Sequence, residues 1–310
     1  MGGSEVPVRL WRSVLAVPGV RPELFPKAAQ GDADRVFLDL EDSVAPDDKE
    51  RARTAVIRGL REVDWPGDGG AVSVRINAID THWMYRDLID VVEQAGAKLD
   101  AIMLPKVRTP GDVEMTDKLL TQIELARGLE PHKIGIEAQI EDAQGLIACE
   151  QIAQASPRME TLIFGPGDYS AAVGIPITTI GGTPDGYPGD HLNYVYSRLV
   201  IAARAAGIQA IDGPYGRVDD DEGLRTRSRL ARALGMDGKW TIHPGQIAIV
   251  NEVFSPAKEE WERAEAMLAA YDEAHAQGRG AAMYDGEMID EANRKMAERI
   301  AEAGRAAGYA

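Results

Sequence analysis

Eight short apolar runs rich in β-branched residues recur along the chain, and stretches with helical periodicity separate them. This alternation is typical of parallel strands that are connected by helices. Eight such units favour a closed (β/α)8 TIM barrel over an open sheet. The predicted strands span residues 13–18, 35–41, 71–77, 101–106, 133–141, 161–166, 208–214 and 239–244.

A change in sequence character after Pro256 indicates a second structural part. The chain has 310 residues, whereas a barrel of this type needs roughly 250. After the barrel the sequence becomes helix-rich, with a glycine break at 278–280. We expect residues 1–255 to form a catalytic TIM barrel and residues 256–310 to form a C-terminal helical lid. Because so short a segment is too small for an independent core, it should pack on the barrel or on a neighbouring subunit.

The charge of the chain disfavours a nucleic-acid partner. There are 50 acidic and 34 basic residues, a net charge of −16, so a bound anion would have to be met by local groups. The sequence contains no run of 18 apolar residues that would predict a membrane span. Its first residues lack the charged and then apolar segments of a signal peptide. Cys149 is the only cysteine, which excludes an intrachain disulfide and fits a reducing compartment. We therefore expect a cytoplasmic protein without nucleic-acid or membrane partners.

The predicted strands end in polar residues or turns. In a barrel the carboxyl ends of all strands lie on one face, where active sites form. Any single charged residue there could cap a helix or belong to a solvated loop, but the recurrence of such residues favours a functional rim. The residues at these ends are Pro18-Gly19, Glu41-Asp42, Arg75 with Asn77, Lys106, Glu141, Asp168, Asp212-Gly213 and His243-Pro244.

Glu141 and Asp168 are the candidate metal ligands. They lie 27 residues apart, each just beyond an apolar run, and a strand, a loop and a helix consume about that length of chain. This spacing would bring two carboxylates together at adjacent strand ends, where they could hold Mg²⁺ or Mn²⁺ and leave positions open for a substrate. For either residue alone, capping of the following helix is an equally good explanation.

Other patterns have ordinary structural alternatives. Residues 175–190 are rich in glycine and proline, which predicts either a substrate-facing loop or a disordered one. Arg51, Arg53 and Arg58 should form the solvated face of a helix, opposite its apolar positions. His243 is interpreted as orienting the last strand and its loop rather than as a base. The chain lacks the G-x-S-x-G elbow of a serine hydrolase and the phosphate-binding loop of an ATPase.

Nine segments match one known family in order and spacing. They are RSVLAVPGVRPELFPKA, FLDLEDSVAPDDKERAR, VRINAID, IMLPKV, IEDAQGL, FGPGDYSAAVGI, AIDGPYGRVDDDEGL, GKWTIHPGQI and DGEMID. From about residue 10 to about residue 300 the chain resembles the citrate lyase β-subunit-like CoA-thioester lyases, Mg²⁺-dependent enzymes of the HpcH/HpaI aldolase superfamily. Within that family, the GGTPDGYPGD loop and the DGEMID tail resemble most the L-malyl-CoA/β-methylmalyl-CoA lyases.

The resemblance implies a TIM barrel with a lid, assembled as a homotrimer or a homohexamer. It implies that Mg²⁺ is held at Glu141 and Asp168 and that Arg75 faces the thioester oxygen. It also implies that Asp285, in DGEMID, reaches the site of a neighbouring subunit, although Asp285-Gly286 taken alone would be a simple turn. The expected activity is that of a carbon–carbon lyase, which interconverts L-malyl-CoA or β-methylmalyl-CoA with glyoxylate and acetyl-CoA or propionyl-CoA.

Such a cleavage needs a base for the β-hydroxyl, a stabiliser for the enolate and an acid for its carbon. Arg75 can offer a fixed guanidinium to the enolate oxygen. Pairing of Arg75 with Glu41 or Asp42, which we include in the catalytic group, would orient it or would be purely structural. Asp285 is the candidate acid or base.

The CoA part of the substrate needs contacts of its own. The turn Pro18-Gly19 with Arg21 is the best candidate for binding a CoA phosphate, because backbone amides, a helix start and a cation can converge there. Lys106 could contact CoA or a substrate carboxylate, or could balance the acidic rim. The alternative activities are those of a malyl-CoA thioesterase, a citramalyl-CoA lyase and a citrate lyase β-like enzyme for citryl thioesters.

Overall fold

The computed structural model describes residues 10–66 and 72–310. Ala71, the first residue of the third predicted strand, lies outside the described residues, as do residues 1–9, which the sequence assigns to the barrel. The chain divides into two compact units, which contain Trp11–Asn251 and Glu252–Ala310.

Eight parallel strands close into a barrel in which consecutive strands are neighbours and β8 pairs with β1. The predicted (β/α)8 fold is therefore confirmed. Most strands end before the predicted limit, since their last polar residues already belong to loops. The strands are β1 (Ser13–Pro18), β2 (Arg35–Asp39), β3 (Val72–Arg75), β4 (Ala101–Leu104), β5 (Gly135–Ile140), β6 (Met159–Phe164), β7 (Gln209–Asp212) and β8 (Gly238–Thr241).

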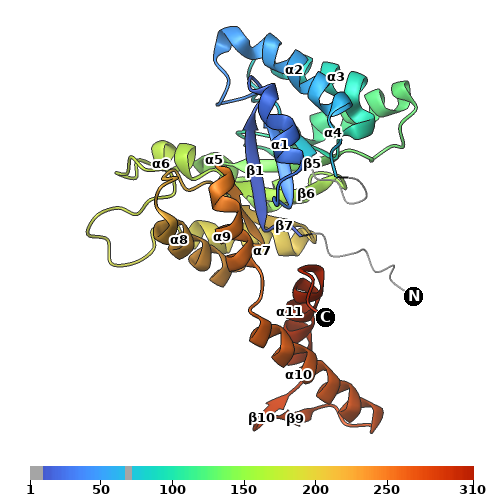
Figure 1. Ribbon diagram of the computed structural model, residues 1–310, viewed down its shortest axis with the longest axis vertical. Coiled ribbons are helices and arrows are strands. Elements are labelled where there is room, and N and C mark those ends of the chain that lie inside the picture. The colour runs from blue at the N-terminus through green and yellow to red at the C-terminus, as the bar shows by residue number, and fades with distance from the viewer. Residues whose placement is uncertain (1–9, 67–71) are drawn as a thin grey trace. The chain divides into compact units, whose positions relative to one another are not determined.

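Helices follow the strands and surround the barrel, with α2, α3 and α4 together on one side of it in Figure 1. Among the described residues, no helix combines the length and the apolar character that a bilayer crossing requires. The helices of this unit are α1 (Phe25–Ala29), α2 (Lys49–Glu62), α3 (Met84–Ala95), α4 (Pro110–Arg127), α5 (Ala143–Ala153), α6 (Pro166–Val173), α7 (Asn193–Ala206), α8 (Asp221–Ala233) and α9 (Ile247–Phe254), of which α9 runs into the second unit.

The barrel interior has an apolar layer and a charged layer. Phe37 and Trp240 belong to the apolar cluster at its centre, with their ring centroids 4.5 Å apart. Two residues before Phe37 on the same strand face, Arg35 forms an ion pair with Glu137 at 3.3 Å, and Ser73 donates a hydrogen bond of 3.2 Å to the same carboxylate. Burial raises the pKa of Glu137 to about 7, even with Arg35 beside it.

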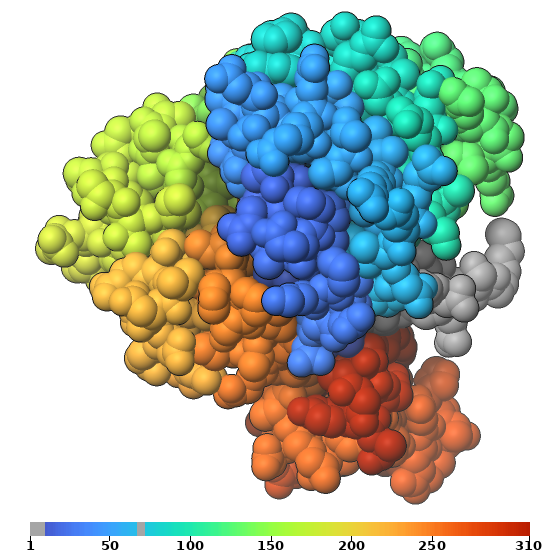
Figure 2. Space-filling view, turned by 45° about the horizontal axis from the view of Figure 1, so that its top comes forward, coloured from blue at the N-terminus to red at the C-terminus, as the bar shows by residue number. Residues whose placement is uncertain are grey.

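Helix α2 shows where periodicity alone misplaces a side chain. Arg51 and Arg58 are exposed as predicted, but Arg53 is buried and donates a hydrogen bond of 2.8 Å to Asp87 of α3. The prediction for Arg53 was wrong because its position faces the neighbouring helix, which supplies a buried carboxylate. On the outer surface, the segment after β1 packs on α2 (Figure 2, dark and lighter blue), where a Cβ at Gly59 would lie 2.4 Å from the Phe25 ring.

Beyond the end of α9, the described residues of the second unit form two helices and a hairpin. Helix α10 (Lys258–Ala276) packs on α11 (Glu291–Ala306) through small side chains, which include Ala264 and Ala301. Between them β9 (Ala282–Tyr284) and β10 (Glu287–Ile289) pair as antiparallel strands. Asp285 and Gly286 form the connecting turn with φ values of 49° and 79°, which is the backbone of a two-residue hairpin turn. Packing of this unit on the barrel or on another subunit stays a prediction.

Candidate active site

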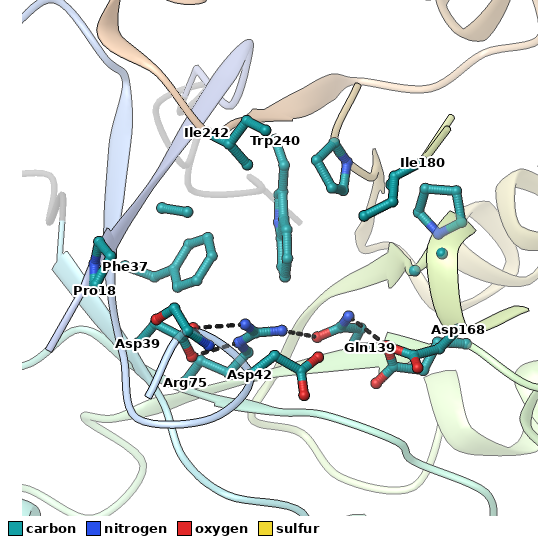
Figure 3. Close-up of a pocket in the computed structure, with 17 residues that line it drawn as sticks. Pro18, Phe37, Asp39, Asp42, Arg75, Gln139, Asp168, Ile180, Trp240 and Ile242 are labelled. Carbon is teal, nitrogen blue, oxygen red and sulfur yellow. Dashed lines mark hydrogen bonds and ion pairs between the residues drawn. The ribbon is translucent and has the colours of Figure 1, made fainter. Parts of the chain in front are cut away.

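A cavity of about 370 Å³ is lined by residues at the carboxyl ends of several strands and by the loops that follow them. Figure 3 shows that apolar side chains gather on one side of it and polar side chains on the other. Some of the predicted strand-end residues therefore converge here, among them Asp42, Arg75, Glu141 and Asp168. The apolar side contains Phe37, Ile180, Trp240 and Ile242, and the polar side contains Asp39, Asp42, Arg75, Gln139 and Asp168.

Arg75 is held by Asp39 at the polar side of the cavity. The two residues end adjacent strands and are register partners, so their side chains meet. The Nε and Nη2 atoms of Arg75 each donate a hydrogen bond of 2.7 Å to a different oxygen of Asp39. Although burial opposes the ionisation of Asp39, the charge of Arg75 holds the pKa of Asp39 below its ordinary value. Burial also opposes the charge on Arg75, but Asp39 raises the pKa of Arg75, so the pair stays ionised.

The remaining side of the guanidinium is directed along the cavity. Nη1 lies 3.1 Å from Oε2 of Glu41 and 3.5 Å from Oε1 of Gln139. The ring of Trp240 lies across the guanidinium, with 5.3 Å between the Arg75 Cζ atom and the ring centroid. Arg75 is thus fixed in orientation, as a donor to a developing anion must be.

Glu141 lies just after β5 and is buried, with both carboxylate oxygens bound by the protein. The backbone N–H of Lys106 donates to Oε1 at 2.7 Å, and Nε2 of Gln139 donates to Oε2 at 2.7 Å. Burial and the neighbouring charge of Asp168 raise the pKa of Glu141 well above its ordinary value. Gly165 packs closely against the Glu141 side chain. A Cβ at position 165 would lie 2.5 Å from the Cβ of Glu141 and 2.6 Å from its Oε2 atom.

Helix capping, the alternative explanation for Glu141 and Asp168, is not the role of either carboxylate. Asp142 is the N-cap of α5, and its side chain accepts a hydrogen bond of 2.7 Å from the amide of Gly145. Asp168 lies in the first turn of α6, whose start has no side-chain cap. Both carboxylates instead line the cavity.

The two carboxylates fit a hard divalent cation. A cation between them would relieve the repulsion that contributes to the raised pKa of Glu141. Within residues 10–66 and 72–310, no three or more His, Cys, Asp and Glu side chains form a metal-binding group. Two protein carboxylates with the other positions left to water and substrate oxygens are a usual arrangement for Mg²⁺.

Lys106 joins the acidic residues after β2 to the loop after β4. Its ammonium donates hydrogen bonds to Glu41 and, at 3.3 Å, to Asp42. Burial raises the pKa of Glu41, although Arg75 and Lys106 both act in the opposite direction. Of the three roles considered for Lys106, these contacts favour balancing of the acidic rim. Lys49, which the sequence did not point to, fixes the same rim by donating to the carbonyls of Leu40 and Glu41 at 2.9 and 2.8 Å.

The turn after β1 has the predicted residues but few free donors. Gly19 N donates to the carbonyl of Asp39 at 2.8 Å, and Arg21 N donates to the carbonyl of Pro18 at 3.0 Å. The predicted helix start is a three-residue 3-10 turn. The exposed Arg21 side chain forms an ion pair with Glu23. Binding of CoA at Pro18, Gly19 and Arg21 stays a prediction, with the Arg21 guanidinium as its main group.

Several other predicted rim residues have structural partners. Asp212 is buried, and its carboxylate accepts a hydrogen bond of 2.5 Å from the ammonium of Lys239, so it does not line the cavity. Asn77 is tied to Asp87 through both its amides. His243 accepts a hydrogen bond of 3.1 Å from Gly245 N and so caps the turn after β8, which supports its interpretation as an orienting residue.

Asp285 lies at the hairpin turn of the second unit, where its side chain is 70% exposed. Its carboxylate lies 3.3 Å from the guanidinium of Arg263. The simple turn that the sequence allowed is therefore present, and an exposed carboxylate at its tip remains available to a second surface. The catalytic role of Asp285 stays a prediction.

Sequence reasoning missed Asp39, Gln139 and the apolar side of the cavity. Asp39 and Gln139 lie inside runs that look like buried strands, and an ionisable or amide group at such a position was itself the available signal. Ile180 belongs to the predicted loop 175–190, which has no helix or strand. Its carbonyl accepts a hydrogen bond of 2.9 Å from Gly216 N, and its side chain lines the cavity. No local sequence signal reveals that contact.

The family model of HpcH/HpaI aldolase/citrate lyase matches residues 12–244, from just before β1 to the turn after β8. The chain belongs to this family. The family expected from the nine sequence segments is thus confirmed, and the match covers every strand of the barrel that carries the cavity.

Individual members of the HpcH/HpaI family cover nearly the whole chain. The L-malyl-CoA/β-methylmalyl-CoA lyase of Cereibacter sphaeroides is 44% identical over 303 residues, 95% of this chain and 94% of that protein. A (3S)-malyl-CoA thioesterase of the same species is 36% identical over 282 residues, 90% of each chain. The protein CitE of Mycobacterium tuberculosis, solved with magnesium, acetoacetate and coenzyme A, superposes with a TM-score of 0.74 at 31% identity, covering 94% of this chain and 97% of CitE.

Proposed function

We propose that this member of the HpcH/HpaI family is a Mg²⁺-dependent carbon–carbon lyase. It would interconvert L-malyl-CoA or β-methylmalyl-CoA with glyoxylate and acetyl-CoA or propionyl-CoA. The observation that carries the proposal is the pairing, in one cavity, of a fixed guanidinium at Arg75 with two carboxylates at Glu141 and Asp168. The 44% identical relative that acts as an L-malyl-CoA/β-methylmalyl-CoA lyase supports it.

Glu141 and Asp168 would hold the metal ion, and Mn²⁺ is an acceptable substitute for Mg²⁺ at two oxygen ligands. When bound, the ion supplies Lewis-acid polarisation of the oxo-acid oxygens. Gln139 and the amide of Lys106 bind the two oxygens of Glu141 and so fix its orientation. The CitE structure, which was solved with magnesium and coenzyme A, supports the proposal of a metal ion in this cavity.

Arg75 would stabilise the enolate of the thioester. Cleavage of the carbon–carbon bond leaves the electron pair on the acetyl or propionyl thioester, where the charge resides on oxygen. A guanidinium held by Asp39 needs no reorientation as that charge forms, and one such donor contributes about 3 kcal/mol to transition-state stabilisation. Glu41, which also contacts Arg75, takes part by orienting it, and Asp42 by contacting Lys106.

Asp285 is proposed as the acid or base at the enolate carbon. In the cleavage direction its carboxylic acid would give a proton to that carbon, and in condensation its carboxylate would remove one. We propose that it acts in a neighbouring subunit of a homotrimer or homohexamer. The exposure of Asp285 at the tip of a hairpin supports an intermolecular role.

The CoA moiety would extend along the turn after β1. Arg21 offers an exposed guanidinium, and Pro18, three residues before it in the sequence, lines the cavity. Lys106 is a second cation at the cavity rim. We place the protein in the cytoplasm, on the strength of its single buried cysteine.

Hydrolysis of the same thioester is the second candidate activity, and the 36% identical malyl-CoA thioesterase favours it. The two reactions differ in their products. Cleavage of malyl-CoA gives glyoxylate and acetyl-CoA, whereas hydrolysis consumes water and gives malate and free CoA.

One assay separates these activities. The purified protein is incubated with Mg²⁺ and malyl-, β-methylmalyl-, citramalyl- or citryl-CoA, and both products are identified by mass. Formation of glyoxylate with acetyl-CoA or propionyl-CoA supports the proposed lyase. Malate with free CoA thiol identifies a thioesterase, and cleavage of only citramalyl-CoA or citryl-CoA identifies one of the other lyases.

A further inference from the structure

Lys106 has a backbone conformation that lysine rarely adopts. Its φ is 54°, in the left-handed region. Among the described residues only two other non-glycine residues, His132 and Asp285, have a positive φ. Strain of this kind persists where the surrounding structure enforces it, and it gathers at functional sites.

The left-handed conformation directs one amide into the cavity. The β4–β5 pairing includes Leu104, and Val107 N again donates to a β5 carbonyl, that of Gln139, at 3.2 Å. Between them the amide of Lys106 points to the Glu141 carboxylate instead, at 2.7 Å. Lys106 therefore acts on Glu141 through its backbone, without its side chain.

The side chain explains why a residue other than glycine can hold this conformation. Glycine would adopt the same φ without strain. The ammonium of Lys106 instead binds Glu41 and Asp42, on the loop after β2. These contacts hold the side chain toward the loop after β2, while the backbone amide faces Glu141.

We propose that Lys106 is a positioning residue for the metal site: its left-handed backbone orients Glu141, and its ammonium locks that backbone by binding Glu41 and Asp42. The inference rests on the proposed function, because it takes Glu141 as a metal ligand. Lys106 also connects the metal-binding carboxylates to the guanidinium, since Glu41 contacts both Lys106 and Arg75.

Substitutions at position 106 separate the backbone from the ammonium. Lys106→Gly and Lys106→Ala both remove the ammonium, but only alanine strains the left-handed backbone. Binding of Mn²⁺ to the metal-free protein, measured by the electron paramagnetic resonance of free Mn²⁺, reports the Glu141 orientation without substrate. We expect Lys106→Gly to bind within about threefold of the wild type and Lys106→Ala to bind at least about fivefold more weakly than Lys106→Gly.

A second pair keeps the test decisive if alanine prevents folding. Asparagine tolerates the left-handed region and glutamine does not, although both carry the same amide. Lys106→Asn should therefore bind Mn²⁺ several-fold more tightly than Lys106→Gln. His132 is the control, since its φ of 68° gives it the same kind of backbone in the loop before β5. His132→Gly and His132→Ala should bind Mn²⁺ with equal affinity.

Equal Mn²⁺ affinities for Lys106→Gly and Lys106→Ala, or for the two amides, in folded proteins would overturn the positioning role. A wild-type protein that is folded but binds no Mn²⁺ would overturn the metal site itself, and this inference with it. The two failures are distinct, because the first leaves metal binding by the wild type intact.

Discussion

Asp39 receives two hydrogen bonds of 2.7 Å from Arg75, one on each carboxylate oxygen, at the ends of two register-paired strands. Asp39 therefore determines where the guanidinium points. Asp39→Asn keeps one acceptor but loses the charge and the second acceptor, so we expect kcat to fall about 10- to 100-fold with little change in KM.

Asp34→Asn is the matched control for Asp39→Asn. Asp34 accepts comparable hydrogen bonds from Arg12, 2.8 Å from Nε and 2.7 Å from Nη2, but does not line the cavity. Steady-state kinetics of both variants should show a loss only at Asp39. Equal losses would mean that the Asp39–Arg75 pair acts through general stability.

Arg75→Lys should lower kcat more than it raises KM. Lysine keeps the positive charge but cannot bind Asp39 through two parallel N–H groups while a third nitrogen contacts Glu41 and Gln139. The measurement is the initial rate of malyl-CoA cleavage across substrate concentrations. An unchanged kcat would show that Arg75 serves structure or ground-state binding alone.

Chelation should abolish activity, and added Mg²⁺ should restore it. Asp168→Asn should weaken Mn²⁺ binding by at least about tenfold, since an amide removes one of two charges from a hard-cation site. Asp220→Asn is a suitable control, because Asp220 is a carboxylate that caps α8 outside the cavity. Full turnover by metal-stripped protein in the presence of EDTA would contradict the assignment.

Arg75→Ala and Asp285→Ala should each be inactive and should recover partial activity when unfolded and reassembled together. Mixed oligomers would contain interfaces at which an intact Arg75 of one chain meets an intact Asp285 of another. Activity is compared with that of each variant refolded alone. No recovery in oligomers that mass spectrometry shows to be mixed would place Asp285 within its own chain or outside the reaction.

Glu137 should make the stability of the barrel depend on pH. Burial raises its pKa from 4.5 to about 7, so between these values the folded state holds a proton that the unfolded state has lost. The stability contributed by the protonated form is fully present below the unfolded pKa and is lost as pH rises through the folded pKa. Relative to the wild type, Glu137→Gln should gain free energy of unfolding between about pH 5 and about pH 8, by up to about 3 kcal/mol.

Denaturant unfolding at several pH values measures this gain. Glu124→Gln is the control: although burial opposes its charge, Arg158 lowers the pKa of Glu124, so that its effect on stability changes with pH only below the ordinary value. Its difference from the wild type should be constant over the same range. A constant difference for Glu137→Gln as well would refute the raised pKa of Glu137.

The barrel was predictable because eight strands alternate with helices, and the rim because polar residues follow the strands at regular intervals. Glu141, Asp168 and Arg75 were selected in this way, and all three line the cavity, while their roles stay predictions. Other features depend on partners that are distant in sequence. Arg53 is buried because α3 supplies Asp87 as its partner. Asp212 does not line the cavity and is instead buried against Lys239 of β8. No local pattern contains that information.

The approach of Gly165 to Glu141 limits how this scaffold can evolve. Every replacement of glycine adds a Cβ, which at position 165 would occupy space already taken by the Glu141 side chain. Because the backbone amide of Gly165 is also bound to the carbonyl of Ile140 at 3.0 Å, the chain cannot simply move aside. Position 165 therefore has to remain glycine as long as Glu141 keeps its place, and substitutions that change the shape of the cavity have to occur at other positions of its lining.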